Sequence, residues 1–402
     1  MPRTARRLAS TSIALILLTG ITTPGLLPAR AAFPGANGMI AFNTGRDGDQ
    51  EIYVMNADGS GQTRLTIDPR GDTEPVWSPD GLRIASQVNI GPDAEIFVMN
   101  ADGSGQMNIS NSPGTVDLRP AWSPDGTKIA FVSRPIAGNN DIWVMNADGS
   151  GRDQLTTDPD SDSEPAWSPD GTRIAFESSR TGNGEIFVMN AADGSGQTNI
   201  TNHPEADGGP SWSPDVTRIA FESDRTGNRD IWVMNPDGTG LTNITNTATD
   251  EYWPAWSPSG TRLLFGADGG DGTDDIFVMN ADGSGRTNLT NFPGESEVTP
   301  DWQPLAPTPK TVRLKAKPKI VETGQKVRLK AKVKPCAGHE RDVVEFYRKK
   351  KRIATKKSNA NCVAKLKVKV VRTTKFRVIS PEQDLDHLAG TSKPVKVKVL
   401  AG

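Results

Sequence analysis

Short apolar runs separated by polar turns repeat along residues 38–304. In one copy, Pro-Ala-Trp is followed by the turn Ser-Pro-Asp-Gly, the apolar run 173–177 (RIAFE), a polar turn and a second run, 185–189 (EIFVM). An Asp-Gly turn then leads into a short segment that ends in Ile-Thr. The runs are rich in β-branched and aromatic residues, and no helical period of 3.6 residues appears in the repeats. Each copy therefore predicts four short β-strands.

The repeats have a period of about 45 residues, which is typical of propeller blades. The tryptophan of the Pro-x-Trp motif occurs at Trp77, Trp122, Trp167, Trp212, Trp256 and Trp302. The segment Val-Met-Asn also occurs six times, ending at Asn56, Asn100, Asn146, Asn190, Asn235 and Asn280. The first copy lacks a Pro-x-Trp strand, and residues 298–304 supply one with nothing after it. We therefore predict an all-β, six-bladed β-propeller with strand-exchange ring closure, which leaves no open sheet edge.

The motifs W-S-P-D-G, I-A-F and V-M-N-x-D-G follow one another in this order in the repeats. In this the chain resembles the TolB-like propeller family, although Val216, Ser259 and Gln303 depart from the motif. The resemblance implies a propeller with a central channel, in which metal ions are found in the family.

Residues 1–31 have three arginines near the start, an apolar run and Ala-Arg-Ala before residue 32. This pattern predicts a cleaved signal peptide, of either the general or the twin-arginine type. We expect a secreted protein, extracellular or periplasmic and associated with the cell wall. The propeller is predicted at 33–304, a Pro-rich linker at 305–309 and a second domain at 310–402.

The second domain carries a strongly basic charge that the near-neutral total conceals. The whole chain has a formal net charge of −2, whereas lysines and arginines far outnumber acidic residues after 309. Apolar and basic residues alternate there with a period of two, which predicts strands with one apolar face. We predict a small β-sandwich, which resembles bacterial Ig-like modules. Because the protein is expected to be exported, we expect its two cysteines, Cys336 and Cys362, to form a disulfide.

The basic residues of this domain concentrate in one predicted hairpin, and three interpretations stay open. They form a solvated face, they dock on the acidic propeller, or they bind a polyanion such as an anionic wall polymer or a membrane surface. Nucleic acid is not expected, because aromatic residues are not interleaved with the basic ones. The candidate contacts are Arg348, Lys349, Lys350, Lys351, Arg352, Lys356 and Lys357.

A carboxylate lies three residues before the proline of every Pro-x-Trp motif. The six are Asp72, Asp117, Asp162, Asp207, Glu251 and Glu297. We expect them to ring one mouth of the channel, with further acids at Glu74, Glu164, Asp250 and Glu295. They would either cap their own turns or form a site for a cationic segment or calcium, at Asp117, Asp162 and Asp207. Tyr252 and Trp253, unique to one copy, are candidates for a ligand-stacking surface beside this mouth or for loop packing.

Candidate catalytic groups are scarce. The chain has three histidines, and only His203 lies in the repeats, so neither a Ser-His-Asp triad nor a multi-histidine metal centre is expected. We predict a monomeric, non-enzymatic envelope scaffold that binds a protein or peptide at the channel mouth, without a certain cofactor. The alternative is a hydrolase or lyase of envelope glycans that uses channel-mouth carboxylates.

Overall fold

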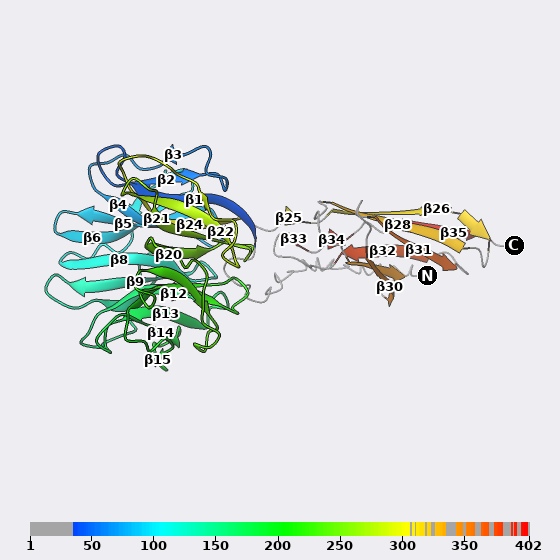
Figure 1. Ribbon diagram of the computed structural model, residues 1–402. Helices are drawn as coiled ribbons and strands as arrows, with labels where there is room; N and C mark the ends of the chain where they lie inside the picture. Colours follow the sequence, from blue (N-terminus) through cyan, green and yellow to red (C-terminus); the bar gives the residue numbers. More distant parts are fainter. Residues whose placement is uncertain are drawn as a thin grey trace, which may run out of the picture.

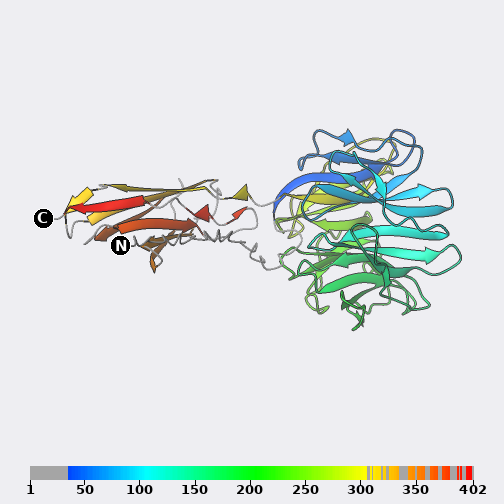
Figure 2. The same cartoon turned by 180° about the vertical axis from the view of Figure 1, so that it is seen from behind.

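The computed structural model describes residues 35–305 and, beyond them, the strand residues from 308 to 400 with gaps between them. Residues 1–34, which include the predicted signal peptide, lie outside the described residues. Figures 1 and 2 show residues 35–305 as one body built of strands. In the described part of the chain, no helix is long and apolar enough to cross a membrane.

Four of the sheets in this body have four strands each, ordered from the channel outward. The first is β24 (Glu297–Leu305), β1 (Ala36–Thr44), β2 (Glu51–Met55) and β3 (Thr63–Arg64). The second is β12 (Asp162–Trp167), β13 (Arg173–Ser178), β14 (Glu185–Asn190) and β15 (Thr198–Asn199). The third is β16 (Asp207–Trp212), β17 (Ile219–Ser223), β18 (Asp230–Met234) and β19 (Thr242–Asn243). The fourth is β20 (Glu251–Trp256), β21 (Arg262–Asp268), β22 (Asp274–Asn280) and β23 (Thr287–Asn288).

The other eight strands of the ring form a single sheet, which corrects the prediction of six separate blades. Its strands are β4 (Asp72–Trp77), β5 (Arg83–Ile90), β6 (Asp93–Asn100), β7 (Met107–Asn108), β8 (Thr115–Trp122), β9 (Lys128–Pro135), β10 (Asp141–Asn146) and β11 (Asp153–Gln154). The two halves of the sheet are joined by one parallel pair, Ala94 with Val116. The strands β6 and β8 both begin earlier in their repeats than their counterparts, and these added residues form the parallel pair. Four blades are therefore separate sheets.

The ring closes through the last strand, as the sequence predicts. β24 pairs antiparallel with β1, with Trp302 opposite Ile40 and Glu297 opposite Thr44. Residues from the two ends of the repeat region therefore share one sheet. Leu305, placed in the linker by sequence, is still part of β24 and pairs with Ala36.

Neighbouring sheets pack through apolar side chains of adjacent repeats. One cluster joins Ile142 and Val144 of β10 to Trp167 and Phe176 of the next sheet. The Asp-Gly turns add a second contact between repeats: Gly149 has φ 86°, and a Cβ there would lie 2.0 Å from the carbonyl oxygen of Ile109. Only glycine fits this approach, which explains the repeated Asp-Gly.

The C-terminal strands form two further sheets and a two-stranded pair. The three-stranded sheet is β26 (Thr311–Lys317), β28 (Lys326–Lys334) and β31 (Val363–Lys369). The six-stranded sheet is β27 (Ile320–Glu322), β35 (Val395–Leu400), β32 (Thr374–Ser380), β29 (Val343–Arg348), β30 (Lys351–Lys357) and β34 (Gly390–Thr391). The pair is β25 (Thr308–Pro309) and β33 (His387–Leu388). Cys336 and Cys362 lie outside the described residues.

Candidate functional site

A break in the register of every innermost strand shapes the centre of the ring. In β12, for example, the pairing with β13 shifts between Ser163 and Ala166, and Glu164 has φ 53°. The same position has φ between 50° and 58° in all six innermost strands. The residues there are Glu74, Arg119, Glu164, Gly209, Trp253 and Thr299.

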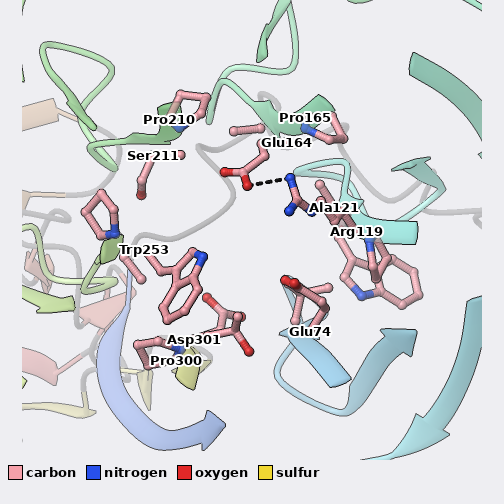
Figure 3. A pocket seen from close by; sticks show the side chains of 18 of the residues that line it. Glu74, Arg119, Ala121, Glu164, Pro165, Pro210, Ser211, Trp253, Pro300 and Asp301 are labelled. Carbon is pink, nitrogen blue, oxygen red and sulfur yellow. Dashed lines mark ion pairs between the residues drawn. The ribbon is translucent and has the colours of Figure 1, made fainter. Parts of the chain in front are cut away.

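These six residues line a cavity of about 220 Å³ at the centre of the propeller, together with the prolines that follow them. Figure 3 shows the side chains of Glu74, Arg119, Glu164 and Trp253 pointing into it from different strands. The Arg119 guanidinium pairs with the Glu164 carboxylate at 2.5 Å. Burial raises the pKa of Glu74 to about 7, although Arg119 acts in the opposite direction.

Three carboxylates make one side of the cavity acidic, next to two consecutive glycines, Gly208 and Gly209. A Cβ at Gly208 would lie 2.6 Å from an Oε atom of Glu177, and one at Gly209 would lie 3.4 Å from Oε atoms of both Glu164 and Glu222. Three carboxylates therefore gather over backbone that has no side chains. Burial raises the pKa of Glu177 to about 7 and that of Glu222 to about 8, and the charge of Glu164 raises both further.

Trp253 forms the aromatic part of the wall. Its backbone N–H donates to Glu222 at 3.0 Å, and its indole ring lies over Gly266, where a Cβ would be 3.1 Å from the ring. Tyr252 packs against the indole with ring centroids 5.3 Å apart, and the guanidinium of Arg229 lies 5.3 Å from the Tyr252 ring. Arg229 also pairs with Glu222 at 3.2 Å, so this arginine connects the aromatic and acidic parts of the site.

Asp301 supplies one more carboxylate to the cavity. It stands where the other Pro-x-Trp motifs have alanine, valine or serine. Its carboxylate accepts the backbone N–H of Trp77 at 2.7 Å. Burial nevertheless raises its pKa to about 7.

The six carboxylates predicted to ring the channel mouth lie two residues before the cavity ring, and their side chains are buried. Their exposed fractions are at most 1 %. In five of them the carboxylate pairs with an arginine of the same sheet. The pairs are Asp117 with Arg152 at 3.0 Å, Asp162 with Arg180 at 2.9 Å, Asp207 with Arg225 at 2.6 Å, Glu251 with Arg286 at 2.7 Å and Glu297 with Arg46 at 2.8 Å.

These pairs define the immediate surroundings of five of the six ring carboxylates. In these five repeats an internal guanidinium lies against the carboxylate and offsets its charge. Asp117, Asp162 and Asp207, the predicted calcium ligands, are three of the five carboxylates that pair with an arginine. Nowhere in residues 35–305 or the described strands beyond them do three metal-ligating side chains form a group that could hold a metal ion.

Asp72 is the exception, since it has no arginine partner. Both of its carboxylate oxygens are buried without a hydrogen bond. Burial raises its pKa to about 7, and the charge of Asp68 adds to the effect.

The sequence prediction found part of the cavity wall. Trp253, Glu74 and Glu164 were expected near the channel mouth and do line the cavity, whereas Tyr252 lies behind Trp253. Glu177 and Glu222 were missed, although they are the only charged residues at that position of the second strand and lie beside the unusual Gly-Gly pair. In the basic domain, the backbone places Arg348 at the end of β29 opposite Lys351 in β30, while Lys349 and Lys350 lie outside the described residues.

Comparison with known proteins yields a family match across most of the ring. A model of the TolB beta propeller domain matches residues 22–134, 104–201 and 194–311. A curated protein of Bacillus subtilis (strain 168), the uncharacterized peptidase YuxL, is 40 % identical over 53 residues, which are 13 % of this chain. The matched segment spans only 8 % of the length of that relative.

Two solved structures are similar to the ring in fold. TolB from Acinetobacter baumannii aligns with a TM-score of 0.60 and 22 % identity, covering 66 % of this chain and 67 % of that chain. A putative TolB from Agrobacterium tumefaciens aligns with a TM-score of 0.54 and 22 % identity, covering 67 % and 100 % of the two chains. At this identity the likeness concerns the fold alone.

Proposed function

The chain belongs to the TolB beta propeller domain family, and on that premise we propose that it is a non-enzymatic recognition protein of the cell envelope. In this proposal the central cavity binds a positively charged segment of a partner protein. The proposal counts the eight-stranded sheet as two blades, so that six repeats surround the cavity.

The asymmetric charge of the cavity wall is the observation that carries this proposal. Carboxylates of Glu74, Glu164 and Asp301 line the cavity, and Arg119 is the guanidinium among them. Glu177 and Glu222 stand behind the glycine pair, where Arg229 offsets one charge. A lysine or arginine side chain would gain from both the acidic side and the face of Trp253, because cations bind carboxylates and indole faces alike.

Titration with a cationic peptide tests the proposal on the full-length protein. We would compare an eight-residue peptide that contains two lysines with the same peptide carrying glutamines, using tryptophan fluorescence at pH 8. The lysine peptide should bind at least tenfold more tightly, which corresponds to about 1.4 kcal/mol. Glu222→Gln should remove most of this difference, whereas Glu205→Gln, at an exposed position, should leave it unchanged. Equal binding of the two peptides would refute the proposal.

The remaining parts of the proposal concern location. We infer that residues 1–31 direct export and that the mature protein is a monomer outside the cytoplasm. The Ig-like assignment of residues 310–402 and the disulfide between Cys336 and Cys362 are part of the same proposal.

In this proposal the hairpin β29–β30 attaches the protein to an anionic wall polymer or a membrane surface. Replacing Arg348, Lys351 and Arg352 by glutamine in the full-length protein should release it from isolated cell walls at lower salt. An unchanged salt dependence would leave the basic strands a solvated face.

A second candidate is the hydrolysis or elimination of envelope glycans. The observation in its favour is the pair of carboxyls Glu177 and Glu222, which lie against Gly208 and Gly209 beside the cavity and whose pKa values of about 7 and 8 suit a general acid. Cleavage of a wall glycan that disappears in Glu177→Gln and Glu222→Gln would support this candidate. Peptide binding without cleavage would favour recognition.

A further inference from the structure

Asp72 stands where five other buried carboxylates hold an arginine. In those five repeats, the guanidinium also lies over the aromatic residue that follows the first isoleucine of the third strand. The distances to the ring centroids are 5.0 Å for Arg46 and Tyr53, 5.8 Å for Arg152 and Trp143, 4.7 Å for Arg180 and Phe187, 4.9 Å for Arg225 and Trp232 and 4.5 Å for Arg286 and Phe277. A guanidinium on this ring can reach the carboxylate in each of these repeats.

The arginine comes from one of two positions in the chain. Arg46, Arg180 and Arg225 follow the second strand of their sheets, whereas Arg152 and Arg286 precede the fourth. In the Asp72 repeat, the turn after the second strand has Gly91-Pro92 and no arginine, and the position before the fourth strand is Gln106. Neither source of a counterion is present.

Arg70 lies over the corresponding aromatic ring of its own repeat, but it comes from a third position in the chain, the loop before β4. Its guanidinium lies 5.1 Å from the ring centroid of Phe97, the counterpart of Phe187 and Phe277. It nevertheless pairs with Asp68, at 3.0 Å, and not with Asp72. Because Ser86 replaces the second aromatic residue over which the other arginines lie, the side chain of Arg70 is less confined on this side.

We propose that Arg70 is a proton-operated latch: it holds Asp68 while Asp72 carries a proton, and it turns to Asp72 when that proton is lost. The groups that face Asp72 leave few alternatives. Val88 lies opposite it in β5, Glu51 of β2 carries the same charge and is paired with Arg64, and the hydroxyl of Thr66 donates to Glu51. Arg70 is the cation whose charge acts on Asp72, and Asp68 is its competitor.

The latch joins a surface loop to the wall of the channel. The loop from Asp68 to Gly71 leads directly into β4, which begins at Asp72 and carries Glu74 into the cavity two residues later. Turning Arg70 away from Asp68 would therefore free the loop at the rim and fix the start of β4. This inference does not depend on the ligand of the cavity.

Carboxyl carbon and arginine nitrogen NMR of the full-length protein, labelled in aspartate and arginine, tests the latch, with the Asp72 signal assigned from Asp72→Asn. Asp72 should titrate with a midpoint near pH 7, in line with the raised pKa of about 7. The Asp68 carboxyl and the Arg70 Nε signals should shift with the same midpoint. An Asp72 midpoint near pH 4, or Asp68 and Arg70 signals that do not follow it, would overturn the proposal.

Two variants separate the latch from simple burial. In Asp68→Asn, a change at a partly exposed site, Arg70 loses its competitor and should pair with Asp72, which lowers the Asp72 midpoint by more than one pH unit and holds the Arg70 Nε signal at its high-pH position below pH 7. The lost charge of Asp68 also lowers the midpoint, but it does not by itself move Arg70. In Gln106→Arg, the new arginine should neutralise Asp72 as Arg152 neutralises Asp117, so that Asp68 and Arg70 no longer respond between pH 6 and 8. An Asp72 midpoint that is unchanged in Asp68→Asn would show that Arg70 does not respond to Asp72, and the latch would be refuted.

Discussion

Replacing Arg225 by methionine tests the buried pairs at their least exposed arginine. The Arg225 side chain is 8 % exposed and donates to both oxygens of Asp207, at 2.8 and 2.6 Å, while the Asp207 side chain is fully buried. Methionine keeps an apolar stem over Phe221 and Trp232 but removes the guanidinium. Asp207 would then be in the position of Asp72, a buried carboxyl without a counterion.

Asp72 gives the scale of the expected loss. Its pKa of about 7, against an ordinary value of 3.8, corresponds to roughly 4 kcal/mol when the group is ionised, at about 1.4 kcal/mol per pKa unit. A carboxyl whose pKa is raised in the folded state does not lower the free energy of unfolding below about pH 4, because the folded and unfolded states both carry the proton there. The loss of free energy grows up to about pH 7 and is constant above it. We therefore expect Arg225→Met to lower the free energy of unfolding by roughly 4 kcal/mol at pH 8 and by about 2 kcal/mol at pH 5.

Urea denaturation followed by tryptophan fluorescence measures this loss in the propeller alone, because all nine tryptophans lie between Trp77 and Trp302. The control is the double variant Asp207→Asn with Arg225→Met, which has no buried charge and should recover most of the loss at pH 8. If Arg225→Met loses the same free energy at pH 5 and pH 8, the arginine contributes packing and not charge, and the reasoning is refuted.

Three further predictions follow from the same geometry. Gly149→Ala should lower the free energy of unfolding by roughly 3 kcal/mol or more, because the added Cβ would clash with the Ile109 carbonyl oxygen. In the same urea experiment, Gly182→Ala should lower it by only about 1 kcal/mol, because Gly182 has φ 103° and open space around it. Gln106→Arg should raise the free energy of unfolding by roughly 2 kcal/mol at pH 8 and by less at pH 5; no gain at pH 8 would mean that the added arginine does not reach Asp72. The lysine peptide should bind more weakly at pH 6 than at pH 8, since Glu222 and Glu177 take up protons over this range; an equal affinity would exclude these carboxyls from the site.

The repeat period, the strand pattern and the closing strand could be predicted because each depends on local sequence. Turn residues such as Ser-Pro-Asp-Gly and the alternation of apolar residues act within a few positions, and the missing first strand showed where β24 had to pair. The joining of β6 to β8 could not be predicted in this way. It depends on strands that extend a few residues beyond their counterparts, and no motif marks strand length.

The cavity ring was misplaced by two residues for a physical reason. In a regular strand, residues i and i+2 point to the same side, so that Asp72 and Glu74 would both face the channel. The register break between Thr73 and Val76, with Glu74 at φ 53°, ends this alternation and leaves Asp72 inside the blade. Because non-glycine residues rarely adopt positive φ, nothing in the sequence Asp-Thr-Glu-Pro signals the break.

The arginine pairs show why aligned motifs alone do not reveal the counterion. Asp162 and Glu251 occupy the same position in their repeats, yet Arg180 and Arg286, which neutralise them, lie at different positions. Both arginines reach the carboxylate because both guanidinium groups lie on the same ring of the third strand. The aromatic residue, and not a fixed arginine position, is therefore what the repeats share. The Asp72 repeat therefore keeps an arginine over this aromatic residue, with Arg70 on Phe97, but it lacks the ion pair between that arginine and the buried carboxylate.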